Sequence, residues 1–74
     1  MNIIHEIGRL AKKANPKGNM TNSIVIQAWD NASGKQMHQI VATVVDEHGR
    51  EIIARSNDGI EETLKILEAE IGDG

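Results

Sequence analysis

Hydrophobic positions near the start of the chain recur every three or four residues, which is the spacing of one face of a helix. Asn2 belongs to the residue types that cap helix starts, and Asn15 precedes a proline, where the α conformation is disfavoured. The pattern predicts a helix over residues about 2–14, in which Gly8 is tolerated rather than required for close packing. Its apolar face comprises Ile3, Ile7, Leu10 and Ala14, with Ile4 and Ala11 beside them.

Three segments in the middle of the chain have the composition and the alternation of β-strands. They cover residues about 23–29, 36–46 and 50–56, and short turn sequences connect them. The second connection, Asp46-Glu47-His48-Gly49, predicts a tight hairpin with Gly49 in the left-handed conformation. We therefore expect a three-stranded antiparallel meander.

The last part of the chain shows the clearest helical pattern. Four apolar residues repeat there at the spacing of a single helix face, and Gly72 follows them as a stop signal. Asp58 and Glu61, three residues apart, are typical of a capping box at a helix start. The pattern predicts a helix over residues about 58–71 with the apolar face Ile60, Leu64, Leu67 and Ile71.

The element order predicts an α+β fold, α-β-β-β-α, in a single domain over residues 1–74. Two apolar helix faces suffice to cover one face of a three-stranded sheet, so both helices are expected on the same side. The other face then stays open, which is typical of a protein contact. Both alternate sets of the first strand are apolar and fit that face: Val25, Gln27 and Trp29, or Ile24, Ile26 and Ala28. The alternative is that the helices and the connection at Met20 cover more of the sheet.

Length and composition exclude several classes of protein. The chain has 74 residues, no cysteine and a single aromatic residue, Trp29. The missing cysteines exclude a disulfide scaffold and a thiolate zinc site, and one aromatic ring cannot form a stacking platform for single-stranded nucleic acid. No apolar run approaches the ~20 residues that cross a bilayer, and no targeting segment is evident, so we expect a cytoplasmic protein.

Catalytic, metal and cofactor sites have little support in the sequence, and we expect none. No nucleophile has a base at motif spacing, and no phosphate-binding glycine loop occurs. The three candidate imidazole ligands lie on three different predicted elements, without an HxH or HxxxH pair. They are His5, His38 and His48.

The net charge of -3 conceals an uneven distribution. Residues 1–20 carry four basic side chains against Glu6, a net charge of +3, whereas residues 57–74 carry six acidic side chains against Lys65, a net charge of -5. The two ends neutralise each other if the fold places them side by side. The basic stretch is also the one plausible phosphate-binding surface, and its side chains are Arg9, Lys12, Lys13 and Lys17.

Two families of nucleic-acid-binding domains share part of this topology. The order α-β-β-β-α resembles double-stranded RNA-binding domains, but residues 57–62, where that family is basic, are acidic here. Residues 38–67 also resemble the arm-type DNA-binding domains of phage integrases, whose sheet enters the major groove. The strands of this chain carry few basic side chains that could contact bases in that groove. A nucleic-acid-binding regulator that uses the basic first helix is therefore the alternative hypothesis.

The opening helix, the meander with its acidic hairpin and the closing helix also resemble the layout of small phage-encoded protein inhibitors of CRISPR nucleases. The segments that carry the resemblance are Met1-Asn2-Ile3-Ile4 and Asp46-Glu47-His48-Gly49-Arg50-Glu51. Those inhibitors present acidic loop residues at a site where the nuclease reads DNA. The resemblance implies that Asp46, Glu47 and Glu51 hold the matching positions, and that the chain is a small phage-type inhibitor or accessory protein.

We hypothesise a non-enzymatic protein-binding module, from a phage or mobile element, that occludes the surface of a host nuclease or defence factor. Trp29 is the expected anchor, because tryptophan is enriched at binding hot spots. The remaining alternative is a structural or assembly subunit that self-associates, as a homodimer or a ring, through the open sheet face. The expected contact residues are Val25, Gln27 and Trp29 on that face, with Asp46, Glu47 and Glu51 as an acidic rim.

Overall fold

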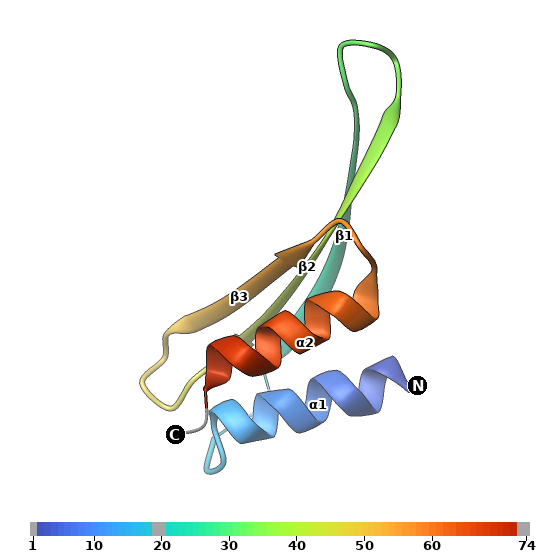
Figure 1. The fold of residues 1–74 in the computed structure, drawn as a ribbon. Coiled ribbons are helices and arrows are strands. Elements are labelled where there is room, and N and C mark those ends of the chain that lie inside the picture. The colour runs from blue at the N-terminus through green and yellow to red at the C-terminus, as the bar shows by residue number, and fades with distance from the viewer. Residues whose placement is uncertain (1, 19–20, 73–74) are drawn as a thin grey trace.

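The computed structural model describes residues 2–18 and 21–72, so Met20, which the alternative to an open sheet face invoked, lies outside the described residues. The chain forms helix, strand, strand, strand and helix, which confirms the predicted α+β fold (Figure 1). Each element lies within about two residues of its predicted bounds. The elements are α1 (Ile3–Ala14), β1 (Asn22–Asp30), β2 (Gln36–Val45), β3 (Glu51–Ser56) and α2 (Ile60–Ile71).

The three strands form one antiparallel sheet in the order β1-β2-β3, and both helices pack on the same face of it (Figure 1). The core lies between the two layers, where Leu10, Val44 and Leu67 are fully buried. Ile24 packs against this core, and in the register it lies opposite Ala42, which in turn lies opposite Ala54. The helix-covered face is therefore the one that carries Ile24, and the open face is the one that carries Val25.

The first hairpin runs on past the rest of the sheet. β3 pairs with β2 only from Ile40 to Val45, so the beginning of β2 pairs with β1 alone. We call residues 27–39 the arm. Figure 1 shows the arm projecting beyond both helices, and it contributes to a long axis of 47 Å. The arm is two-stranded, and neither of its faces is covered by a helix.

The two helix starts differ in their capping. Asn2 caps α1 as predicted, because its side-chain oxygen accepts a hydrogen bond from the backbone N–H of His5 (3.2 Å). The capping box predicted for the last helix is wrong. α2 begins after Gly59, which has a φ of 114° and no side-chain capping bond, and Asp58 instead donates its backbone N–H to the hydroxyl of Ser56. A positive φ of this kind is strained for residues other than glycine, so Gly59 is well suited to the N-cap position. The helix therefore begins at Ile60, two residues later than predicted.

Both hairpins are closed by the same kind of turn. Gly34 and Gly49 have φ values of 81° and 78°, and each donates its N–H to the carbonyl of the residue that opens its turn, Asn31 or Asp46. This is a type I turn followed by a left-handed glycine, one of the common short hairpin connections. The left-handed conformation predicted for Gly49 is confirmed.

Candidate protein-binding surface

The open face of the sheet is depleted of charge. Side chains alternate along a strand, so the odd-numbered residues of β1 and β2 point to this face, and none of them is charged. Among its apolar side chains, Val25 is 48% exposed, Trp29 is 44% exposed and Ile53 is 40% exposed. β3 adds Glu51 and Arg55 to the same face, on either side of Ile53, so the charges lie along its β3 edge. An apolar centre with charges at its edge is typical of a protein interface.

The apolar side chains of the open face form two patches. Val25 lies opposite Val41 in the body of the sheet, with Ile53 one strand further, and Trp29 lies opposite Met37 on the arm. Gln27 lies opposite Gln39 between the two patches. Val41 is itself buried beneath its neighbours. Together these side chains form what we call the open-face surface: Val25, Gln27, Trp29, Met37, Gln39, Val41 and Ile53.

Sequence reasoning found the β1 half of this surface and missed the other half. The three contact residues expected on the first strand, Val25, Gln27 and Trp29, do lie together on the open face. Met37 and Val41 were missed because they become neighbours of β1 only through the strand register. The turn sequence carried that signal, since a three-residue turn closed by Gly34 fixes Trp29 opposite Met37.

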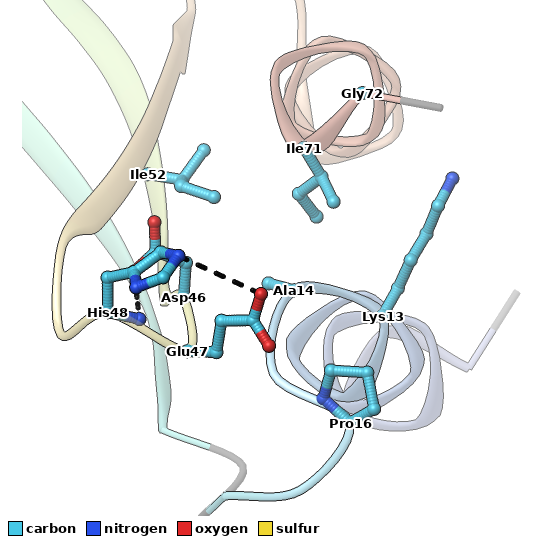
Figure 2. Close-up of a pocket in the computed structure, with 9 residues that line it drawn as sticks. All are labelled: Lys13, Ala14, Pro16, Asp46, Glu47, His48, Ile52, Ile71 and Gly72. Atoms are coloured by element: carbon cyan, nitrogen blue, oxygen red, sulfur yellow. Dashed lines mark hydrogen bonds and ion pairs between the residues drawn. The ribbon is translucent and has the colours of Figure 1, made fainter. Parts of the chain in front are cut away.

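The acidic hairpin lies far from Trp29. Asp46 is nine residues along β2 from Met37, the partner of Trp29, which is about 30 Å in a strand. Glu51 is on the open face, opposite Val45, whereas Asp46 and Glu47 border a pocket on the helix side (Figure 2). The structure therefore does not bring the expected anchor and the expected acidic rim into one site.

Asp46 holds its own turn together. Its side-chain oxygen accepts hydrogen bonds from the backbone N–H groups of Arg50 (2.9 Å) and His48 (2.8 Å). The bond from Arg50 is the main reason that the pKa of Asp46 is lowered from its ordinary value, and the bond from His48 adds to it. Asn31 receives the matching bonds from Ser33 and Lys35 in the first hairpin. The carboxylate of Asp46 thus has a structural task that the sequence prediction did not assign to it.

A pocket of about 390 Å³ lies between this hairpin and the ends of both helices (Figure 2). Ala14, Pro16, Ile52 and Ile71 form much of its wall, and Figure 2 shows the Lys13 side chain directed away from the hairpin. His48 and Glu47 face each other across 3.8 Å at its edge, both largely exposed. These side chains form no arrangement of nucleophile, base and oxyanion donor of the kind that hydrolysis requires.

The basic residues of α1 are partly occupied by α2. Arg9 binds Glu6 of its own helix and both carboxylate oxygens of Glu68 (3.3 Å each), and Lys13 lies 3.5 Å from the same carboxylate. The hydrogen bond that Arg9 donates to Glu6, followed by those it donates to Glu68, raises the pKa of Arg9, and the bonds to Glu68 lower the pKa of Glu68. The fold thus brings basic residues of the first helix beside an acidic residue of the last one, and their charges partly neutralise each other. Lys12 and Lys17 stay exposed.

Candidate metal ligands do not gather in the part of the chain that the structure describes. His5 lies on α1, His38 on β2 and His48 in the second hairpin, and no three His, Cys, Asp or Glu residues among residues 2–18 and 21–72 could hold a metal ion. Over the same residues, no helix has the length and apolar character required to cross a membrane.

Comparisons with protein-family models, with curated proteins and with solved structures gave no match.

Proposed function

We propose that this chain is a non-enzymatic protein-binding module that acts by occupying the surface of another protein. The observation that carries the proposal is the open-face surface, on which three large apolar side chains are at least 40% exposed and no charge interrupts β1 or β2. Burying such side chains stabilises a complex by roughly 25 cal/mol for each Å² of apolar area removed from water.

The partner class in this proposal is a host nuclease or defence factor of the cytoplasm, the target of the phage-encoded inhibitors that the element order resembles. Trp29 is the anchor, because it combines a large apolar ring with a position near the projecting end of the arm. Glu51 is the one acidic residue of the predicted rim that shares the open face. Asp46 and Glu47 are left out of the contact, since they border the opposite face of the sheet.

The nucleic-acid alternative has less support. Two of its four basic side chains, Arg9 and Lys13, are engaged by Glu68, which reduces the positive potential that phosphate would meet. Arg55 is the one Lys or Arg side chain that the three described strands place on the open face, and a single basic residue offers little to read bases.

The test is binding to purified nucleases, including a guide-loaded CRISPR nuclease, by calorimetry. We expect Trp29→Ala to weaken the affinity of a bound nuclease by about 30-fold, the effect of losing ~2 kcal/mol at a hot spot, and Ile53→Lys to weaken it similarly. Lys65→Glu is the matched control, because it changes an exposed charge of α2 on the other side of the molecule. A nuclease that binds all three variants as tightly as the wild type contradicts the proposed surface.

A further inference from the structure

The two edges of the sheet differ in how they are protected against pairing with another strand. β3 is a six-residue edge strand whose Glu51 and Arg55 flank Ile53, and charged edge residues discourage pairing. β1 is nine residues long and carries no charge, proline or glycine from Ser23 to Trp29. Its register with β2 is also continuous, without a bulge. Between Ser23 and Trp29, the β1 edge thus lacks the charges, prolines and bulges that usually protect an edge strand.

The backbone of β1 offers hydrogen-bonding groups along this edge. In an antiparallel ladder, successive residues direct their N–H and C=O groups to alternate sides. Asn31 donates to Lys35 across the hairpin end, so the odd-numbered residues of β1 face β2. The backbone groups of Ile24, Ile26 and Ala28 therefore point away from the sheet.

The side chains near this edge are also exposed and apolar. Ile26, at the base of the arm on the helix side, is 58% exposed, and Ile4 of α1 is 80% exposed. Ile4 lies half a turn around α1 from Lys13, which faces α2 through Glu68. Since α2 packs mainly on β3 whereas α1 packs on β1 and β2, Ile4 lies on the flank of α1 that is on the β1 side.

We infer that the β1 edge pairs with the β1 edge of a second copy of this chain, antiparallel, with the two Ile26 residues opposite each other. Ile24 then lies opposite Ala28 of the second copy, so residues whose backbone groups point outward meet each other. The dimer has a continuous six-stranded sheet with four helices on one face. This inference does not depend on the proposed function, because the pairing leaves the open face of both copies uncovered.

A second copy is favoured over a foreign strand because the pairing completes the arm. A two-stranded ribbon is marginally stable in water and requires a third strand or a packed helix. In the symmetric register, residues 27–30 of each copy lie beside residues 22–25 of the other, so each arm gains its third strand from the body of its partner. The strand opposes no like charges, because Asp30 meets Asn22.

The area at this edge approaches the size that a stable dimer needs. β1 is about 30 Å long, and the shortest dimension of the molecule is 19 Å, so this side offers at most on the order of 600 Å² in projection, since no helix backs the arm residues of β1. Stable interfaces bury about 800 Å² of accessible surface from each partner. The projected area is smaller than the solvent-accessible area, because protruding side chains such as Ile4 and Ile26 add surface.

The test is the solution mass by light scattering over a concentration series for the wild type and three variants. Ile26→Lys places a charge on the proposed axis, and Ala28→Pro removes an outward-pointing N–H at a position where an edge strand tolerates proline. Ile53→Lys is the control, because it alters the open face and the opposite edge. Far-UV circular dichroism and thermal unfolding verify that each variant is folded.

We expect the wild type to reach twice its monomer mass of 8.1 kDa. Ile26→Lys and Ala28→Pro are expected to weaken dimerisation by about 100-fold or more, because Ile26→Lys buries a charge at the axis and Ala28→Pro leaves the carbonyl of Ile24 in the second copy unmatched. Ile53→Lys is expected to stay dimeric. A wild type that is monomeric even at millimolar concentration, a dimer that persists in either edge variant, or a loss of the dimer in the Ile53→Lys control overturns the inference. Binding of a nuclease is measured separately, so failure of the proposed function leaves this result unaffected.

Discussion

Gly8 is the residue at which α1 has unused room. A Cβ atom added there meets nothing within 4 Å, so the glycine is tolerated rather than required for close packing, as the sequence indicated. We expect Gly8→Ala to raise the free energy of unfolding by ~0.5 to 1 kcal/mol, because alanine loses less backbone entropy in a helix. Urea unfolding measures the change. A destabilised Gly8→Ala variant contradicts the open environment.

Asp46 makes the stability of the fold depend on pH. Its pKa is lower in the folded chain than its ordinary value, so the ionised carboxylate stabilises the fold at pH values above the unfolded pKa, and this contribution disappears as the pH falls through the folded pKa. Asp46→Asn keeps the oxygen that accepts both backbone bonds and reproduces the Asn31 turn of the first hairpin. We expect this variant to fold and to lose stability less steeply than the wild type as the pH falls below the ordinary pKa of aspartate.

Asp46→Ala is the comparison for this prediction. It removes the acceptor altogether, and we expect it to be less stable than Asp46→Asn at neutral pH, as measured by thermal unfolding. Equal stability of the two variants would mean that the hydrogen bonds to His48 and Arg50 contribute nothing to the turn.

At the scale of elements, the contact between α1 and α2 combines a buried apolar seam with an exposed ionic one. At the surface, Glu68 forms ion pairs with Arg9 and Lys13. Leu10 and Leu67 are buried in the core. We expect Glu68→Gln to lower the urea midpoint at low salt and to match the wild type in about 1 M salt, where the Debye length is about 3 Å. Glu70→Gln removes the same charge from an exposed position of the same helix and serves as control. A salt-independent difference would assign the role of Glu68 to packing.

The sequence predicted the elements well because each has its own local signal. Apolar spacing marks both helices, alternation marks the strands, and Asn2, Asn15 and Gly49 act where they were expected. The error at the start of α2 arose because acidic residues near a helix start are favourable whether or not one of them caps it. Gly59 decided the true start.

The contacts between elements were harder to predict. Both alternate sets of β1 are apolar, so only packing against α1 shows that Ile24, rather than Val25, faces the core. The arm follows from the unequal lengths of β2 and β3, which were visible in the sequence, but the end of pairing at Ile40 depends on the register. The pairing of Glu68 with Arg9 spans 59 residues and required the fold itself.

The whole molecule is a two-layer body with one open sheet face and a projecting arm. Its open-face surface and its β1 edge are separate features, one formed by outward side chains and the other by backbone groups and the flank of α1. Substitutions on the two features are therefore expected to have different effects. Ile53→Lys weakens partner binding and leaves the dimer intact, whereas Ile26→Lys weakens the dimer and leaves the open face of each copy unchanged.

The most direct test of the open-face surface is the ¹⁹F NMR signal of a chain that carries 5-fluorotryptophan. Trp29 is the only tryptophan, so the labelled chain gives a single reporter at the proposed anchor. We expect this signal to shift or broaden when an unlabelled nuclease that binds the chain is added. In the Ile53→Lys variant, the signal should change far less at the same concentrations. A nuclease that binds the chain, as calorimetry shows, while the Trp29 signal stays unchanged would contradict the open face as the contact surface.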